Sequence, residues 1–358
     1  MAAIGNSYLT LLDFAKLTDP SGNLALVVEQ MNRVTSILED AYMIEGNLDK
    51  GHETTLRTGL PTPSWRIINQ GTIRSKSSSK KMAVASATLE AVSAVDSLLV
   101  DSQKNGQAIR MSEASPFLMS MGLTLANQCI YGDVRRNPDR FTGLAAYYAQ
   151  LNAAYQANPD ALVNPSLTLP DSGRNVFDCS EGGKYGTPGN GTNTSMWLTV
   201  WGPNSSHLFF PKGAKAGIVQ EDMGKVPLDD GRGIGAIMFQ YVELFRASMG
   251  LCVRDWRQNV RLANIDTTAL MTAGGDQDNC AQLVSQSINA MNFVHDINDG
   301  KAVWYCNRLV KTALEKKATY QHNAVLNSAI EDGVLVTRLM GIPIHRCDAL
   351  MNTEAAVS

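Results

Sequence analysis

The sequence predicts an α+β protein in which helices and strands are segregated along the chain instead of alternating as βαβ units. Three observations carry this prediction. One strong amphipathic helix is expected over 112–132, short strands separated by turn residues over 194–235, and long alternating strands over 239–265. With 358 residues, the chain exceeds the size at which one core keeps growing, so two sub-domains with extensions are expected.

The N-terminal region is predicted to form two amphipathic helices, one over 9–17 and a second one that ends near Tyr42. The second carries apolar residues at helical spacing, namely Leu24, Val27, Val28, Met31, Val34, Leu38 and Ala41. A polar segment follows and offers this apolar stripe no cover. We therefore expect the N-terminal region to depend on contacts with another molecule.

That polar segment, EGNLDKGHETTLRTGLPTPSWRIINQG followed by TIRSKSSSKKM, begins at Glu45 and alternates as strands do, with Trp65 as its lone aromatic residue. A structureless loop this long is unusual inside a compact domain. Two strands alone are marginal in water and need a surface to cover them. The segment is therefore predicted to be an extended hairpin with its apolar partner on another molecule, which points to assembly.

Next come a predicted strand over 83–95, a short helix or turn at DSLLVDSQ, and the long helix over 112–132. Pro116 is placed in the first turn of that helix, and Gly132 is expected to end it. NPDRFTGLAAYYAQLN predicts another helix. Between 164 and 191 the composition shifts to Pro, Gly, Ser and Asn, which predicts a domain boundary.

After this boundary, TSMWLTVWG, HLFFPKG, AGIVQEDMG and KVPLDDGRGIG predict an antiparallel meander, and FQYVELFRASMGLCVRDWRQNVRLANI predicts long strands. The last third predicts a helix near 280–291, a strand at AVWYCN, a helix at VKTALEKKA and a final strand at GIPIHRCDAL.

Charge and cysteine content restrict the function. A formal net charge of -3 without a basic stripe argues against duplex DNA as a tightly held ligand. The 6 cysteines show no CxxC pair, so reduced thiols and no disulfides are expected. The chain begins with no signal-like segment and has no apolar run long enough to span a membrane, so synthesis in a cytoplasm is expected.

Candidate catalytic motifs are weak. His345 and Cys347 lie two apart on a predicted strand, which a Cys-His dyad or half a metal site would need, but no second ligand pair has metal spacing. The glycine-rich stretch after Asp229 lacks the Lys-Ser/Thr of a phosphate loop and predicts a hairpin turn. Asp pairs at 276/278 and 296/299 lack the remainder of a calcium loop and predict turns and helix caps. No catalytic, cofactor-binding or metal residue is assigned.

Arg254, Asp255, Trp256, Arg257 and Arg261 form a charged and aromatic cluster. Such a cluster can act as a ligand clamp. More often it is a paired ion network on a strand surface or a subunit contact, where Arg and Trp are favoured.

Taken in order, these features resemble the major capsid proteins of tailed bacteriophages, in the podovirus-type group. The strings that carry the resemblance span nearly the whole chain: GHETTLRTGLPTPSWRIINQG, EASPFLMSM, YGD, NPDRFTGLAAYY, TSMWLTVWG, FFPKGAKAG, LCVRDWRQNVRLANID, WYCNR and GIPIHRCDALMNTEA. Each string is short, but the collinear set is specific.

The resemblance implies the shell-protein fold shared by tailed phages and herpesviruses. By this resemblance, 1–45 is the N-terminal arm, 46–82 the E-loop hairpin, 83–163 a peripheral domain with its spine helix at 112–132, and 164–358 an axial domain. Part of the C-terminal segment is expected to return to the peripheral domain. The implied function is self-assembly into an icosahedral shell around the double-stranded DNA of a phage.

The implied partners are copies of the chain itself in pentamers and hexamers, a separate scaffolding protein, a portal and a cement protein, and no membrane. A separate scaffold is expected because the arm starts almost at Met1. Packaged DNA is expected to make weak, non-specific contacts, with Arg33, Arg135 and Arg136 as candidates. Subunit contacts are expected at Trp65, Arg57, Arg66, Lys76, Lys80, Lys81, Met31, Leu38, Arg254, Trp256 and Arg257.

Two other functions remain open from the sequence. One is a ring-forming adaptor or tail protein of a virion. The other is an enzyme of unknown chemistry with the polar arm as a lid, for which no motif provides an active site.

Overall fold

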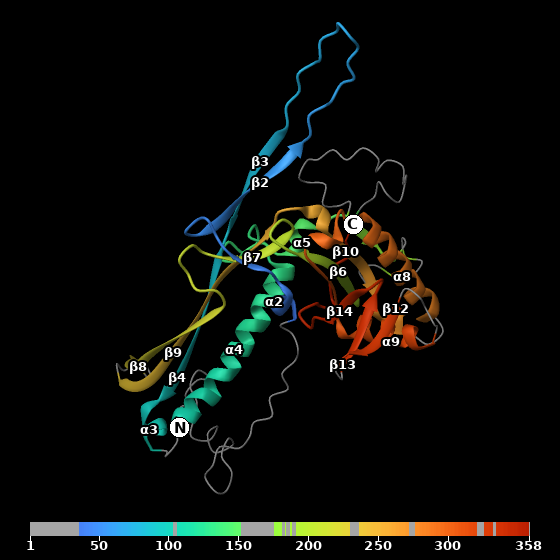
Figure 1. Cartoon of the computed structure of the whole chain (residues 1–358). Coiled ribbons are helices and arrows are strands. Elements are labelled where there is room, and N and C mark those ends of the chain that lie inside the picture. Colours follow the sequence, from blue (N-terminus) through green and yellow to red (C-terminus); the bar gives the residue numbers. More distant parts are fainter. Residues whose placement is uncertain are drawn as a thin grey trace. The chain divides into compact units, whose positions relative to one another are not determined.

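A computed structural model describes residues 36–102, 106–151, 175–180, 183, 187, 191–229, 236–271, 276–320, 326–331 and 334–357 (Figure 1). By its internal contacts the chain divides into two units. We call the one that contains Thr88–Leu125 and Ala214–Ser248 the spine unit. The other contains Arg33–Ala87, Ala126–Gly213 and Met249–Ser358, and we call it the sheet unit.

The sheet unit is built around strand β6 (Asn193–Trp201), which pairs antiparallel with both β10 (Asn259–Asp266) and β11 (Lys301–Cys306). β5 (Val176–Asp178) adds to β10 in parallel, and β14 (Ile342–Arg346) adds to β11 in parallel. β13 (Val334–Leu339) and β12 (Leu326–Glu331) continue the sheet as an antiparallel hairpin. Every residue of β6 and β10 is buried, which is expected of strands covered on both faces.

Helices complete the core of the sheet unit. They are α7 (Thr267–Met271), α8 (Asp276–Phe293) and α9 (Arg308–Tyr320), with the short 3-10 helices η3 (Trp256–Gln258) and η4 (Ile297–Asp299) beside them in the chain. Side chains of α8 and α9 join those of β6, β10 and β11 in one apolar cluster, which includes Leu198, Leu262, Leu283, Trp304 and Leu314. Burial of this area is the main driving force for folding of the unit.

A second group of strands in the sheet unit carries the hairpin. β1 (Met43–Glu45), which follows helix α2 (Ser36–Asp40), pairs in parallel with β7 (Ser206–Phe210). β7 in turn pairs antiparallel with the C-terminal end of β9 (Ile237–Val253). β2 (Gly51–Gly59) and β3 (Ser78–Ala85) form an antiparallel hairpin that extends away from these strands (Figure 1).

The spine unit contains β4 (Ala87–Asp96), α3 (Ser97–Asp101), β8 (Ile218–Asp229), most of β9 and the first twenty residues of the long helix α4 (Gly106–Tyr131). β8 and β9 pair as an antiparallel hairpin from Ile218↔Ala247 to Asp229↔Ile237. The Arg110 side chain, on α4, makes ion pairs with Asp222 (2.8 Å) and Glu243 (2.9 Å). These pairs fix the helix against both strands of that hairpin.

Several predicted elements are confirmed. The region expected as one strand over 83–95 is extended, but it is divided at Ser86 between the end of β3 and β4. The short helix or turn expected at DSLLVDSQ is the helix α3, where the Asp96 carboxylate accepts a hydrogen bond from Leu98 N at 2.9 Å. The last third has its predicted helices as α8 and α9 and its predicted strands as β11 and β14. All six cysteines are free and buried, as expected of reduced thiols.

The long helix begins earlier than predicted. We expected 112–132, but α4 starts at Gly106, which moves Pro116 from the first turn into the helix interior. The prediction had Ser112 and Glu113 open the helix, so that Pro116 stood in the first turn, where a proline costs little. In the structure tertiary contacts outweigh the cost of a proline inside the helix. Here Phe117, the next residue, stacks on Phe245 at 6.5 Å and Ile109 joins a buried cluster with Val95.

Other expectations about the middle of the chain were wrong. NPDRFTGLAAYYAQLN was expected to be a helix, but only α5 (Leu144–Tyr147) forms in its described part, and it ends at Tyr148, whose φ of -116° and ψ of 56° are not helical. The Tyr148 hydroxyl donates to the Trp256 carbonyl at 2.7 Å. The predicted meander is also wrong, since β6 and β7 meet in parallel at Trp201↔Ser206.

The single strand β8 spans the end of AGIVQEDMG and the start of KVPLDDGRGIG, where two strands were expected. Gly224 has a φ of 71° and sits at an irregularity in the pairing with β9, so it acts as a bulge within the strand where a turn was expected. The hairpin β12–β13 was not predicted. The helix expected over 9–17 lies outside the described residues. So does most of the second N-terminal helix, which was expected to end near Tyr42; α2 is its described part.

Candidate subunit interface

The predicted extended hairpin is present. β2 and β3 pair from Gly51↔Ala85 to Gly59↔Ser78, with an irregularity between Arg57 and Gly59. Residues 60–77, which we call the hairpin tip, connect the two strands, and each of them is exposed. Within the tip, Arg66 Nε donates to the Gln70 carbonyl at 2.9 Å and Ser75 Oγ donates to the Thr62 carbonyl at 2.9 Å. These bonds are local, and the described residues provide no apolar cover for the tip.

Large apolar side chains gather on this tip. Trp65 has an exposed fraction of 104% and Ile68 one of 87%. The exposed apolar residues of the tip are Leu60, Trp65, Ile67, Ile68 and Ile73. Contiguous exposed apolar side chains are typical of interaction sites, because leaving them in water costs free energy that a partner's surface removes. The sequence reading found Trp65 but gave no weight to the isoleucines beside it.

The predicted cationic contacts lie on the same hairpin. Arg57, Arg66, Lys76 and Lys80 are exposed. Lys81 Nζ pairs with Glu53 across the two strands at 2.8 Å, and this hydrogen bond raises the pKa of Lys81. Arg66 and Lys76 therefore lie within the tip and Arg57 and Lys80 on the strands beside it, whereas Lys81 also has a role inside the hairpin.

Close backbone contacts hold the base of the hairpin against its own unit. Gly46 N donates to the Phe210 carbonyl at 2.7 Å, and Gly213 N donates to Glu45 Oε1 at 2.9 Å. A Cβ atom on Gly46 would come within 2.7 Å of the Gly51 carbonyl oxygen, and one on Gly51 within 2.6 Å of the Val84 carbonyl oxygen. Only glycine fits at these two positions, so the direction in which the hairpin leaves the sheet is set by backbone packing.

The cluster after β9 is a set of internal pairs. Arg257 makes two hydrogen bonds to Asp255, at 2.9 and 2.7 Å, and Arg254 Nη1 donates to Asn204 Oδ1 at 3.2 Å. Trp256 is buried, with an exposed fraction of 8%, which leaves its ring little area for a neighbouring subunit. The contact predicted through Trp256 stays a prediction. Among the described residues, Arg254 and Arg257 bond to protein groups instead of converging as a ligand clamp.

Two predicted contact residues belong to the N-terminal region. Leu38 lies on α2 and is half-buried, and Met31 lies outside the described residues. The end of α2 is fixed by Asp40, whose carboxylate accepts from Lys301 Nζ at 2.6 Å and from Tyr305 OH at 3.0 Å. His345 Nδ1 lies 2.5 Å from Asp40 Oδ2, the oxygen that also accepts from Tyr305.

The contact between His345 and Asp40 argues against the Cys-His dyad suggested for His345 and Cys347. The hydrogen-bond partner of His345 is Asp40, while Cys347 is fully buried and burial raises the pKa of its thiol to about 11. A thiol in that state is a poor nucleophile. The other weak motifs also have structural roles: Asp229 pairs with Ile237 in the β8–β9 hairpin, and Asp296 caps η4 by accepting from Asn298 N at 2.9 Å.

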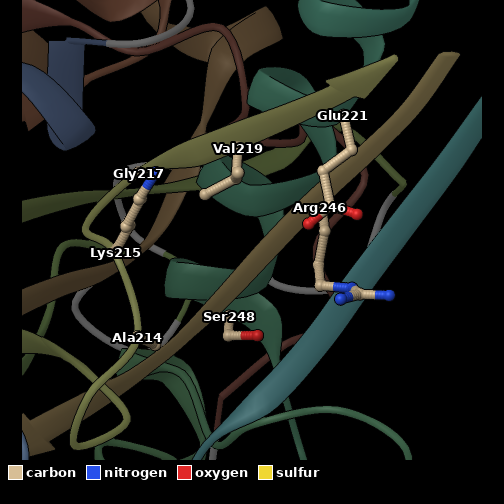
Figure 2. A pocket seen from close by; sticks show the side chains of 7 residues that line it. All are labelled: Ala214, Lys215, Gly217, Val219, Glu221, Arg246 and Ser248. Atoms are coloured by element: carbon tan, nitrogen blue, oxygen red, sulfur yellow. The ribbon is translucent and has the colours of Figure 1, made fainter. Parts of the chain in front are cut away.

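An open pocket lies on the spine unit between β8 and β9 (Figure 2). Its lining consists of Ala214, Lys215, Gly217, Val219, Glu221, Arg246 and Ser248. Arg246, the main polar group, is paired with Glu90 at 2.6 Å. The pocket thus offers no convergent set of free polar groups of the kind that binds a small molecule.

Comparisons with known proteins identify the family. Residues 19–358 match the family described as major capsid protein GP7. The chain belongs to this family. The solved structure of bacteriophage Epsilon15 contains a similar chain, with 29% identity and a TM-score of 0.73 over 100% of this chain and 99% of that one. No curated protein is significantly similar to the capsid protein in sequence.

Two further phage-related structures are similar at a much lower level. The capsid of bacteriophage JBD30 gives 10% identity and a TM-score of 0.47 over 90% of this chain and 93% of that one. The capsid of a native GTA particle gives 12% identity and a TM-score of 0.41 over 73% and 99%. Neither value is high enough to bear on the fold.

Family membership confirms the main prediction. The protein is a structural component of the virion, where it forms the capsid shell, and it has the mixed helix and sheet fold of phage major capsid proteins. It is not an enzyme, and the alternative of an adaptor ring is set aside. Among the described residues, no helix is long and apolar enough to cross a membrane.

Proposed function

We propose that the β2–β3 hairpin ties each capsid subunit to a neighbour in the shell by docking its tip on that neighbour. The observation that carries this proposal is the complete exposure of Trp65 among the isoleucines of the tip. Buried aromatic residues dominate the energetics of interfaces, and two strands without a covering surface are marginal in water. The exposed cations Arg57, Arg66, Lys76 and Lys80 would then face acidic groups at the rim of the contact.

Substitution of Trp65 tests this proposal. Trp65→Ala should leave the subunit folded, since the part of the chain that the structure describes leaves the ring fully exposed, and should weaken assembly by about 2 kcal/mol or more per contact, as for an interface hot spot. The measurement is the yield of closed shells per folded subunit, by sedimentation and electron microscopy. Leu98→Ala is the matched control, because Leu98 is another exposed apolar residue, on α3.

The outcome that would contradict the proposal is equally clear. If Trp65→Ala unfolded the subunit while the folded remainder assembled normally, Trp65 would be a folding residue. If Leu98→Ala impaired shells as strongly as Trp65→Ala, the effect would not be specific to the hairpin tip.

We also propose pentamers and hexamers as the building units of the shell. A closed shell from one chain needs heterologous contacts that close into rings, and arms that join rings without fixing a single angle. Weak contacts are sufficient when each subunit makes many at once, since effective concentration multiplies them. The hairpin is packed at its base, at Gly46 and Gly51, and exposed at its tip, so it can join rings without fixing the angle between them.

A separate scaffolding protein, a portal and a cement protein are further proposed partners, and their support is the family membership. Expression of the chain alone tests the scaffold. We expect irregular or open assemblies, whereas closed shells of one uniform size from this chain alone would argue against a separate scaffold.

Contact with the packaged double-stranded DNA is proposed to be weak and non-specific. The net charge is -3, and affinity for DNA scales with the number of phosphates neutralised. Arg135 and Arg136 are exposed, but both lie beside Asp133, at 3.3 and 3.8 Å, and Arg33 lies outside the described residues. Tight binding of purified subunits to a duplex at physiological salt would contradict this.

We propose the domain borders stated above, with one addition. The arm at 1–45, the E-loop at 46–82, the peripheral domain at 83–163 and the axial domain at 164–358 follow from the family resemblance. Because Ala214–Ser248 groups with Thr88–Leu125 by contacts, we add β8 and the first part of β9 to the peripheral domain. Limited proteolysis of subunits tests this addition, since the two segments should be protected together.

A further inference from the structure

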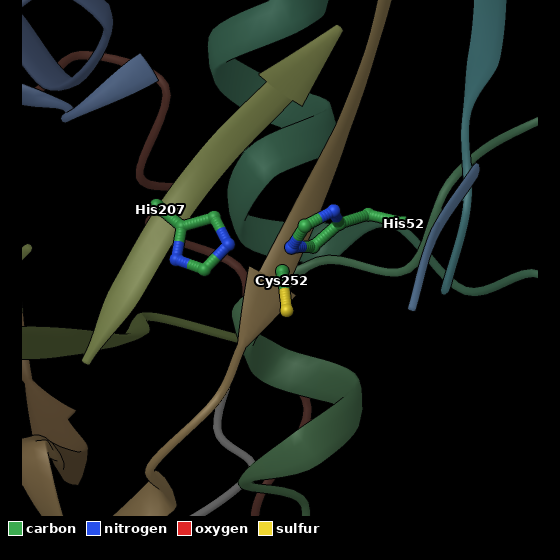
Figure 3. A group of neighbouring side chains, drawn as sticks. All are labelled: His52, His207 and Cys252. Atoms are coloured by element: carbon green, nitrogen blue, oxygen red, sulfur yellow. The ribbon is translucent and has the colours of Figure 1, made fainter. Parts of the chain in front are cut away.

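Three side chains that commonly bind metals meet at the base of the hairpin. His52 belongs to β2, His207 to β7 and Cys252 to β9, and their ligand atoms all lie within 4.8 Å of one another. His207 and Cys252 are direct cross-strand partners, which places both side chains on one face of the β7–β9 pair. Figure 3 shows the two imidazole rings facing each other from β7 and β2, with Cys252 on β9 between them.

Three ring nitrogens of this cluster lack a hydrogen-bond partner in the described part of the chain. His207 is 1% exposed, and no hydrogen bond of normal geometry reaches either of its ring nitrogens. His52 is 9% exposed, and its Nδ1 also has no partner. Buried polar groups are nearly always hydrogen-bonded, and each exception calls for an explanation, of which an unobserved ion is one.

The protonation states suit a cation. Burial lowers the pKa of His207 to about 4, with smaller effects from His52 and Arg254 and a partly offsetting interaction with the Gly202 backbone. Burial likewise lowers the pKa of His52. Both imidazoles are therefore neutral near pH 7, which is the form that binds metals.

The cysteine supplies the negative charge. Cys252 is fully buried, and burial raises the pKa of its thiol to about 11, so the metal must displace its proton. Thr54 Oγ1 lies 3.9 Å from Cys252 Sγ and can donate to the thiolate once that proton has left. The thiolate charge also offsets the repulsion of a cation by Arg254, whose charge acts on all three groups.

We propose that His52, His207 and Cys252 bind one Zn²⁺ ion per chain. Nitrogen and sulfur ligands favour zinc over magnesium or calcium, which take oxygen ligands. Zinc binds such ligands at about 2.0–2.1 Å for nitrogen and about 2.3 Å for sulfur, so a small inward movement of the three side chains completes the site. A water molecule takes the fourth tetrahedral position. Binding releases one proton, from the Cys252 thiol.

The consequence is a cross-link at the base of the hairpin. The ion would join β2, at the start of the hairpin, to β7 and β9 of the same unit. A structural metal of this kind adds its binding free energy to the stability of the fold. It would fix the hairpin base while leaving the tip free to dock.

The test uses the full chain. Because the cluster is buried, the subunit is refolded in the presence of Zn²⁺ and a non-chelating reductant, then freed of loose metal, and zinc per chain is measured by mass spectrometry. Refolding with Co²⁺ gives a second readout, because a thiolate ligand produces a charge-transfer band in the near ultraviolet. We expect one ion per chain and a clear cobalt-thiolate band.

Variants locate the site. Cys252→Ala and His207→Gln should each weaken zinc binding at least tenfold, and Cys252→Ala should abolish the cobalt band. Cys347→Ala is the matched control, since Cys347 is also buried and free but lies outside the cluster, and it should bind zinc as the parent does. Circular dichroism checks that each variant folds.

Wild-type protein decides the matter even if a variant does not fold. Less than one tenth of an ion per chain in the refolded parent, with no cobalt-thiolate band, would overturn the proposal. So would equal zinc content in folded Cys252→Ala and in Cys347→Ala. A parent chain that binds Cu⁺ and excludes Zn²⁺ would overturn the choice of metal.

Discussion

At the scale of single residues, Glu354 is the counter-ion of a buried cation. Its carboxylate accepts from Arg261 Nη2 at 2.8 Å and also from the hydroxyls of Ser195 and Tyr131. Both charged side chains are nearly fully buried. Loss of one partner from such a pair is strongly destabilising, because it leaves an uncompensated charge in the interior.

Glu354→Gln should therefore lower the free energy of unfolding by about 3–5 kcal/mol. Denaturant unfolding of the unassembled subunit measures this. Asp139→Asn is the control, because Asp139 pairs with Arg140 at the surface over 3.9 Å, and its effect should stay within about 0.5 kcal/mol. If the two substitutions lowered the free energy of unfolding by similar amounts, the buried pair of Arg261 and Glu354 would contribute no more to stability than a surface pair.

Asp40 predicts a dependence of stability on pH. Burial acts to raise the pKa of its carboxyl, but hydrogen bonds from His345 and Lys301 outweigh burial and hold the pKa below its usual value of 3.8. A carboxyl with a lowered pKa in the folded state stabilises the protein above 3.8, and this contribution is lost as the pH falls through the folded-state pKa.

Asp40→Asn should therefore reduce thermal stability at neutral pH and flatten its decline below pH 3.8. Melting temperatures of parent and variant across the acid range test this, with Asp139→Asn as the exposed control. If the melting temperature of Asp40→Asn fell as steeply with decreasing pH as that of the parent, Asp40 would not be a source of the acid sensitivity.

The sequence could suggest exposed residues more readily than buried networks. Trp65 was recognisable because a lone aromatic residue in a polar segment has no local partner. The pair of Arg261 and Glu354 was not, because its members lie 93 positions apart. The same holds for His52, His207 and Cys252, which only the strand pairing brings together.

At the scale of elements, the long helix α4 contains Pro116 at an exposed position in its interior. A proline there removes a hydrogen bond to the preceding turn and crowds it, which costs about 3 kcal/mol in a regular helix. The proline side chain offers little packing in return, since it is exposed.

Pro116→Ala should therefore raise the free energy of unfolding of the isolated subunit by about 1–3 kcal/mol, as the missing hydrogen bond forms. Urea unfolding measures the change, and Ser120→Ala, one turn further along α4 and also exposed, is the control. A loss of stability in Pro116→Ala would mean that the helix is shaped around its proline.

Elements with strong internal patterns were predictable, and those decided by distant contacts were not. α8, α9 and β11 follow from periodicity alone. The early start of α4, the short α5 and the parallel contact of β6 with β7 depend on residues far away in sequence. Tertiary contacts override local propensity at such places.

At the scale of the whole molecule, the α+β class and the shell function followed from the order of elements and from the collinear family strings. Family membership confirms both. The surface on the neighbouring subunit that binds the hairpin could not be predicted from the sequence. An interface consists of two surfaces, and the residues of the second surface lie elsewhere in the sequence with no pattern that links them to the hairpin.

The central claim is that the hairpin tip gains its apolar cover only in the shell. Amide hydrogen exchange over residues 60–77, compared between unassembled subunits and assembled shells, tests it most directly. We predict fast exchange in subunits, because no strand pairing protects the tip, and slow exchange in shells, where a neighbour covers Trp65. Equal exchange in the two states would contradict the account.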